Sequence, residues 1–229
     1  MLPIRSLICI CALACASPTL AAEAATGLYI GAGVGQARYG IDLGQQVARA
    51  YATSPFAVSS ARLDGAHDTA LRVFAGYAFS PHFAIEAGWQ DLGSVNGGYT
   101  LRNTSTDEMF GRNDKWDLSG VDALFVAQYP FAERFAILGK VGAFYSKLDF
   151  REIATDSDGS RSTYHANADK DVHLIWGLGG SWRFNERLSA RLDWDRIENV
   201  GTKFALDDDG NGQFDHVDAW RVSLIWQFL

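Results

Sequence analysis

Oxygen-bearing side chains near the carboxyl end of the chain could bind a metal ion. In the stretch DDDGNGQFDHVD they are Asp207, Asp209, Asn211, Gln213, Asp215 and Asp218. Their spacing matches the calcium loop D-x-[DN]-x-[DN]-G-x5-E, with Gly212 at the sixth position and Asp218 where glutamate is usual. Because no helices flank the stretch, an acidic solvated turn explains it equally well. Calcium is therefore the one cofactor that the sequence suggests, and none is required.

Glycines crowd together in a second stretch, GLYIGAGVG at residues 27–35, and raise the question of phosphate binding. A dinucleotide loop needs G-x-G-x-x-G between a strand and a helix, whereas this stretch reads G-x-G-x-G and no helical period follows. Leu28, Ile30 and Val34 fall on one face, and Gly31 and Gly33 fall on the other. That alternation predicts a β-strand.

The sequence gives little support for catalysis or for nucleic-acid binding. None of the five histidines stands in a spacing that identifies a Ser, His and Asp arrangement, and triads are recognised by geometry more than by spacing. The formal charge of −7 argues against a nucleic-acid partner, since such domains usually carry a basic patch. We expect neither an enzyme nor a nucleic-acid-binding protein.

The same alternation recurs along the chain. It occupies residues 27–35, 69–79, 82–90, 119–129, 135–145, 171–184, 188–195 and 219–228. One face of each segment is apolar, and the other is rich in glycine and single charges. Glycine weakens a strand unless space is needed, and a narrow closed barrel needs that space inside. The pattern therefore predicts eight strands whose apolar faces look outward to lipid; a soluble aromatic-rich barrel is the alternative.

The connections alternate between short and long. Short turns lie at 80–82, 130–134 and 185–187, and long polar segments at about 39–68, 92–118, 148–170 and 197–217. Bacterial outer-membrane barrels have short periplasmic turns and long outer loops, with aromatic girdles at both interfaces. We therefore expect an antiparallel up-and-down barrel with both termini in the periplasm. The first long segment carries a weak helical signal in DLGQQVARAYATSPF.

The first residues resemble a secretory signal. Arg5 precedes a short apolar core at residues 7–16, and small residues follow it. We expect a cleaved signal peptide at 1–24 and one barrel domain at 25–229. Cys9, Cys11 and Cys15 all lie in the signal, so the mature chain would form no disulfide. Lipoprotein processing at Cys15 is the alternative.

Several segments resemble a known family, the eight-stranded transmembrane domain of outer-membrane protein A and its small relatives. They are GLYIGAGVG, AGYAFSPHFAIEAGWQDLG, GVDALFVAQYPF and RLDWDRIENVG. The resemblance implies a monomer in the outer membrane of a Gram-negative bacterium, in contact with membrane lipid and lipopolysaccharide. It also implies insertion by the barrel-assembly machinery, read from Arg221, Ser223, Trp226 and Phe228 in the closing RVSLIWQFL.

Charged residues should point into the barrel by their parity. They are Arg72, Glu86, Asp122, Lys140, Arg183, Arg191, Asp193 and Arg221. In the family, an inward glutamate and an acid of the seventh strand join a lumenal ion-pair network, and Glu86 and Asp193 match them. The family's fourth-strand lysine is replaced by Val126, and Lys140, Arg72 or Arg221 could substitute. Because eight strands leave an interior that side chains can fill, the charges favour a plug over a gated pore.

The function that follows is structural or surface-interacting, through the long outer segments. A small, low-conductance pore lined by the mixed charges is the alternative. A lipid-modifying outer-membrane enzyme comes third, because no catalytic arrangement supports it.

Overall fold

The computed structural model describes residues 26–165, 169–201 and 214–228 of the 229-residue chain. The expected signal peptide lies outside these residues. The strands are β1 (Gly27–Gly40), β2 (Phe56–Asp64), β3 (His67–Ala78), β4 (Phe83–Asn103), β5 (Met109–Pro130), β6 (Phe135–Thr155), β7 (Arg161–His165), β8 (Asp169–Arg183), β9 (Leu188–Val200) and β10 (Phe214–Gln227), and the helix is α1 (Leu43–Ala50). No helix in the described part is long and apolar enough to cross a membrane.

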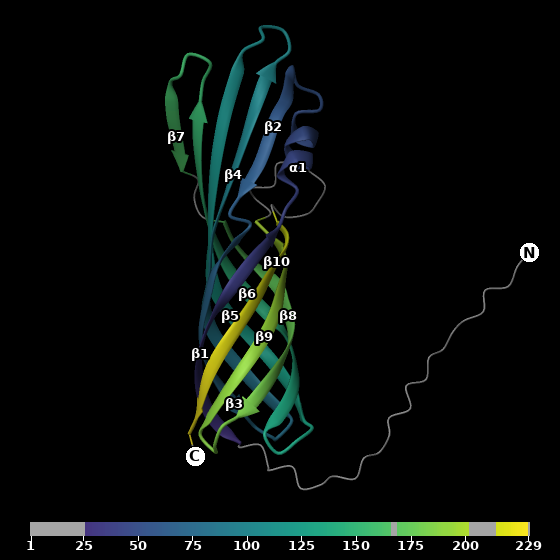
Figure 1. Cartoon of the computed structure of the whole chain (residues 1–229), viewed down its shortest axis with the longest axis vertical. Coiled ribbons are helices and arrows are strands. Elements are labelled where there is room, and N and C mark those ends of the chain that lie inside the picture. Colours follow the sequence, from purple (N-terminus) through teal and green to yellow (C-terminus); the bar gives the residue numbers. More distant parts are fainter. Residues whose placement is uncertain (1–25, 166–168, 202–213, 229) are drawn as a thin grey trace, which may run out of the picture.

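Eight of the strands pair antiparallel around a closed barrel. Their order is β1, β3, β4, β5, β6, β8, β9 and β10, and β10 returns to β1 with Tyr29 opposite Gln227 and Gly40 opposite His216. Short turns join β3 to β4, β5 to β6 and β8 to β9 at one end, where β1 begins and β10 ends (Figure 1). The predicted up-and-down barrel is confirmed.

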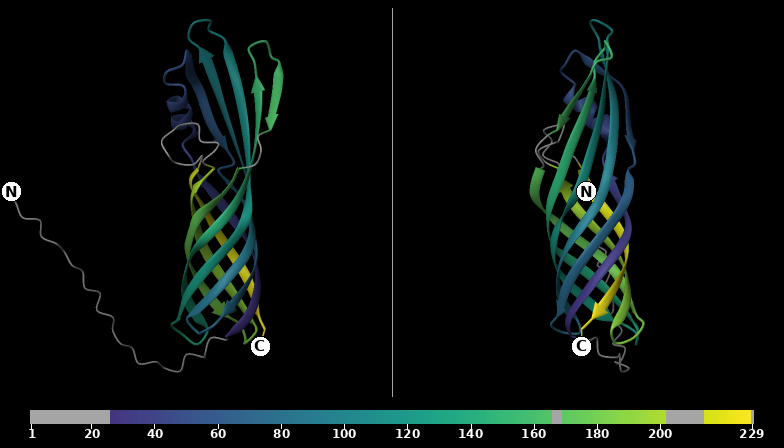
Figure 2. Two further views of the ribbon diagram at one scale, coloured as in Figure 1. Left: turned by 180° about the vertical axis from the view of Figure 1, so that it is seen from behind. Right: turned by 90° about the vertical axis from the view of Figure 1, so that its left-hand side faces the viewer.

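The long polar segments differ from the expected loops because much of them is strand. β4, β5 and β6 run for 21, 22 and 21 residues and continue past the barrel (Figure 2). There β2 pairs with the end of β4, and β7 pairs with the end of β6. We call the residues 43–64, 95–117 and 149–165 the extension. These strands lack the apolar outer face that lipid requires of the barrel strands, so their sequence pattern predicts loops where the structure has strands.

Local features separate the extension from the barrel. The β4–β5 register shifts between Asp91 and Ser94, around Gly93 with φ of 76°. The Asp68 carboxylate accepts a hydrogen bond of 2.7 Å from the Ser94 backbone N–H at this bulge. The expected helix is confirmed as α1, which begins after Asp42, whose carboxylate accepts from the backbone N–H of Gln45 at 3.0 Å.

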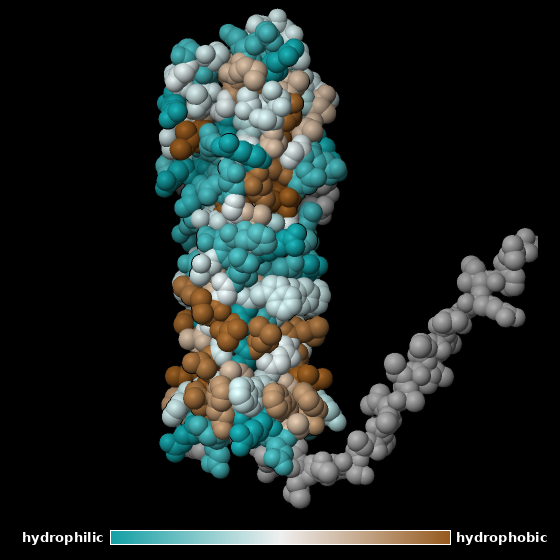
Figure 3. All heavy atoms as spheres, viewed as in Figure 1, coloured by the Kyte–Doolittle hydropathy of each residue, from teal (hydrophilic) through white to brown (hydrophobic). Residues whose placement is uncertain are grey.

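The barrel carries its apolar side chains outside and its charges inside. Leu178 is 59% exposed and Val222 is 56% exposed, whereas Arg72 and Asp193 are 2% and 1% exposed. On the face seen in Figure 3, hydrophobic residues gather across the lower part of the molecule, and most of the surface above them is hydrophilic. This inversion is what a barrel surrounded by lipid requires.

Aromatic side chains mark both edges of the apolar belt. At the short-turn end Phe83 stacks on Phe125 with centroids 5.6 Å apart, and Phe135 stacks on Trp182 at 6.1 Å. Toward the extension, Trp176 and Trp194 meet edge to face at 5.0 Å, and Trp194 lies 6.2 Å from Trp220. The two groups match the girdles expected at the two interfaces.

The inward glycines let neighbouring strands approach closely. A Cβ at Gly35 would overlap the backbone carbonyl oxygen of Trp220 on β10, which cannot move without disturbing the strand that closes the barrel. Gly139 has the outward parity of Ile137 and Val141, and a Cβ there would meet only Leu178, at 3.9 Å. The inward glycines such as Gly35 therefore provide room for strand closure and not a phosphate site.

We expect Gly35→Ala to lower the free energy of unfolding by about 1–3 kcal/mol, the usual cost of overfilling a packed interior. Gly139→Ala is the matched control and should change it little. Urea unfolding of both variants in detergent micelles, followed by gel mobility, measures the difference. Equal midpoints for the two variants would contradict the proposed close approach.

Candidate functional site

A closed network of ion pairs crosses the lumen and is the main candidate site. Its members, in order of contact, are Lys140, Asp193, Arg191, Glu86, Arg72, Asp122, Gln90, Arg221 and Asp195, which returns to Lys140. They come from β3, β4, β5, β6, β9 and β10. We call these nine residues the ion-pair network.

Glu86 is the most heavily contacted acid of the network. Its carboxylate accepts from Arg72 Nη1 at 2.9 Å and from Arg191 Nη1 at 2.5 Å. The Tyr29 hydroxyl donates to Glu86 Oε1 at 3.0 Å. The guanidinium carbons of both arginines also lie over the Phe74 ring, 4.5 and 4.7 Å from its centroid. Glu86 thus neutralises two arginines that both lie against one aromatic ring.

The opposite side of the network is joined by bidentate and amide contacts. Arg72 donates to Asp122 through Nε at 3.0 Å and Nη2 at 2.6 Å. Gln90 donates to Asp122 at 3.2 Å and accepts from Arg221 at 2.8 Å, and Arg221 pairs with Asp195. This side therefore links β3, β4, β5, β9 and β10.

Lys140 closes the network from β6. Its ammonium lies 2.9 Å from Asp193 and 2.7 Å from Asp195, within ion-pair distance although not aligned as hydrogen bonds. Four basic and four acidic side chains then balance, and each is at most 4% exposed. Charges this deeply buried persist only when they are paired, so the network behaves as one neutral unit.

The structure brings together seven of the eight charged residues that the sequence placed in the lumen. The eighth, Arg183, is the last residue of β8 and lies outside the network, at the short-turn end. Asp195, Gln90 and Tyr29 complete the contacts and were missed, although all three fall on the inward face by parity. The counter-charges for Glu86 are Arg72 and Arg191, and Lys140 serves Asp193. Val126, at the position of the family's lysine, is 2% exposed and packs in the interior without a charge.

An apolar layer fills the lumen between the ion-pair network and the extension. Its inward side chains are Leu92, Leu118, Phe144, Ile175, Ile197 and Val217, each at most 1% exposed. Above it the Phe214 ring lies 5.0 Å from Tyr39 and 5.8 Å from Trp116. The Tyr39 hydroxyl donates to the Leu92 carbonyl at 3.0 Å. Parity assigns each side chain to a face but does not say which side chains of different strands lie at the same height, so it predicted neither feature.

The extension has its own core and one buried acid. Leu43 and Val47 of α1 pack with Tyr99 and Trp116 in the buried cluster. Asp114 on β5 is 3% exposed and lies opposite Glu152 of β6 in the strand register. Burial, together with the nearby Glu152 carboxylate, raises the pKa of Asp114 to about 7. This acid therefore changes charge near neutral pH.

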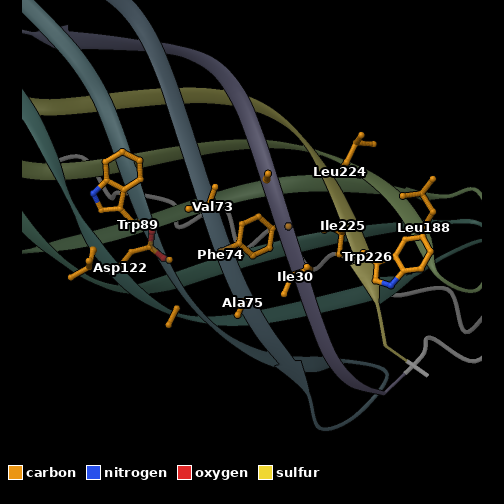
Figure 4. A pocket seen from close by; sticks show the side chains of 15 residues that line it. Ile30, Val73, Phe74, Ala75, Trp89, Asp122, Leu188, Leu224, Ile225 and Trp226 are labelled. Carbon is orange, nitrogen blue, oxygen red and sulfur yellow. The ribbon is translucent and has the colours of Figure 1, made fainter.

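The residues of the expected assembly signal separate by face. Arg221 and Ser223 point inward and are 1% and 2% exposed, whereas Trp226 and Phe228 are 43% and 45% exposed. Trp226 lines a hollow of about 920 Å³ on the outer surface, shown in Figure 4 with Trp89 at one end and Leu188 near the other. The hollow is apolar because most of the outward residues around it, such as Val73, belong to the lipid-facing belt.

Most of the predicted calcium loop lies outside the described residues, including Asp207, Asp209, Asn211 and Gln213. Asp215 and Asp218 are in β10, and Asp218 accepts from Arg196 Nε at 2.7 Å and Nη2 at 2.8 Å. A calcium ion would therefore have to compete with Arg196 for the closing carboxylate. Within the described ranges, no three His, Cys, Asp or Glu side chains are grouped to hold a metal.

A contact between a serine and a histidine also escaped the sequence analysis. Ser146 Oγ on β6 lies 2.8 Å from His173 Nε2 on β8. The two side chains are 2% and 6% exposed. Parity placed His173 inward, but only the β6–β8 pairing brings Ser146 beside it. Both groups are buried, and their contact joins the two strands.

The match to a protein-family model agrees with the fold. The model of the outer membrane protein beta-barrel domain family matches residues 7–228. A search of curated proteins found no match. Three similar solved structures are Neisserial surface protein A, Ail of Yersinia pestis and OprG of Pseudomonas aeruginosa, each matched over 89% of this chain. Their sequence identities to this chain are 12%, 13% and 16%, and their TM-scores are 0.47, 0.45 and 0.41. The matches cover 98%, 100% and 96% of those three chains.

Proposed function

We propose that this chain, which belongs to the outer membrane protein beta-barrel domain family, acts through its outer surface and not as a channel. It is an integral β-barrel protein of the bacterial outer membrane. Bacterial barrels turn tightly on the periplasmic side, so the extension faces the outside of the cell. The observation that carries the proposal is the closed lumen, filled by the neutral ion-pair network below and the apolar layer above.

A conducting lumen would need a continuous polar path. The ion-pair network leaves no surplus charge to attract an ion. An ion that crossed the apolar layer would also have to lose its hydration shell, which is costly. Phe144 and Leu118, at 0% and 1% exposure, stand in that path. These features support a plug that makes the barrel rigid and carries the extension.

The extension supplies the interaction surface. β2 pairs only with β4 and β7 only with β6 among the described strands, so each presents one unpaired edge. All five residues of β7 are exposed. Unpaired strand edges are surfaces on which other chains add strands. The rigid barrel would hold these edges away from the membrane, where a partner can reach them.

Single-channel recording in a planar bilayer tests the proposal. We expect no discrete openings from the inserted wild-type protein. We also expect none from Glu86→Ala, because the apolar layer still closes the lumen. Insertion is verified by protection of the barrel from added protease. Discrete openings in the wild type, or openings that appear with Glu86→Ala, would favour the pore instead.

A further inference from the structure

The periplasmic end of the lumen opens into two small cavities in line. The outer cavity, of about 100 Å³, lies between the β5–β6 turn, the β8–β9 turn and the end of β10. The inner one, of about 80 Å³, reaches Arg191 of the ion-pair network. Both share Gln128, Ser181, Ser189 and Gln227 in their walls. We call the outer cavity the periplasmic mouth.

Positive charge converges on the periplasmic mouth. Phe135 pairs with Trp182, and the Arg183 N–H donates to the Arg134 carbonyl at 2.8 Å, so the two arginines lie opposite each other across β6 and β8. Arg187 is a third basic residue in the wall, and Glu186 is the only acid among the wall residues described.

The periplasmic mouth also touches the lipid-facing surface. Phe135 and Leu188 line it from the apolar side. Leu188 lines the large apolar hollow too, and it pairs in register with Trp226. Figure 4 shows Leu188 and Trp226 close together at one end of that hollow. A basic cavity and an apolar hollow thus meet at Leu188, within the periplasmic aromatic girdle.

We propose that an anionic phospholipid of the periplasmic leaflet docks here, with its phosphate at the periplasmic mouth and an acyl chain in the apolar hollow. Arginine forks bind phosphate oxygens with charge-assisted hydrogen bonds. The surplus of three arginines over one glutamate selects an anionic headgroup. The small outward side chains of Ala75 and Ala87 leave the depth that an acyl chain needs. Charge complementarity and the adjoining hollow together define the occupant.

Native mass spectrometry of the whole protein, in micelles doped with one lipid at a time, tests the site. We expect one phosphatidylglycerol to be retained in preference to diacylglycerol with the same chains. Arg183→Gln or Arg134→Gln should weaken retention about tenfold, the loss expected for one charge-assisted contact. Glu186→Gln should strengthen it. Arg151→Gln, an exposed arginine of the extension, is the control and should change nothing.

Two variants test whether an acyl chain occupies the apolar hollow. Ala75→Phe fills the hollow and should reduce retention. Ala143→Phe is the control, because Ala143 lies on the same row of paired outward alanines (Ala75, Ala87, Ala123) but outside the hollow. Equal retention of phosphatidylglycerol and diacylglycerol would overturn the proposal. So would equal losses in Arg134→Gln and Arg151→Gln, or competition by inorganic phosphate alone that displaces no lipid.

Discussion

Glu86→Ala is expected to lower the free energy of unfolding of the barrel by about 3–5 kcal/mol, the range seen when one member of a buried ion pair is removed. The carboxylate contacts both Arg72 and Arg191. Its loss leaves two guanidinium groups against the Phe74 ring, each retaining one carboxylate, from Asp122 and Asp193 respectively. The closed network becomes an open chain with one surplus positive charge in the lumen.

Equilibrium urea unfolding in micelles, followed by tryptophan fluorescence, measures this loss. Asp64→Ala is the matched control, because Asp64 pairs with Arg62 at 3.0 Å while 62% of its side chain is exposed. An exposed pair of this kind contributes about 0–1 kcal/mol. If both variants lost the same small amount, the network would carry no special weight in stability. Glu86→Gln, which keeps the volume, should fall between them.

The strand faces could be predicted from sequence because lipid imposes a strict rule. Every barrel strand must present an apolar side chain at each second position, and the inward glycines and charges then follow by parity. This alternation puts Glu86 and Asp193 on the inward face, and it puts Asp195 there as well. Which acid meets which base depends on the stagger of the strands around the barrel, and a single strand does not encode that.

The extension could not be predicted because its strands obey no lipid rule. Residues 95–103 alternate around a small local core, covered on one side by α1. Gly97 meets Trp116 and Leu43 there, a contact that needs the β4–β5 bulge to redirect both strands. Polar sequence with glycine and asparagine resembles loop until the partner strands are known.

Asp114→Asn is expected to stabilise the extension at neutral pH and to remove most of its pH dependence. The folded pKa of Asp114, about 7, lies above the ordinary value of 3.8. The folded state therefore binds this proton more tightly than the unfolded state does. Stability is full below about pH 4 and falls as the pH rises to 7, because the carboxyl must ionise while buried opposite Glu152. The total cost is roughly 4 kcal/mol, at 1.4 kcal/mol for each unit between the two pKa values.

Hydrogen exchange by mass spectrometry, corrected for intrinsic rates, measures local opening of residues 43–64 and 97–118 between pH 4 and 8. Wild-type protection should fall across this range, and Asp114→Asn should hold it nearly level. Arg112 and Tyr99 face the same acid, and Glu152→Gln should produce a smaller change in the same direction, since it removes only the repulsive charge and leaves the burial. Protection that rises with pH in the wild type, or a slope unchanged by Asp114→Asn, would show that another group governs the extension. The barrel residues 140–145 serve as the internal reference, because their exchange should not follow Asp114.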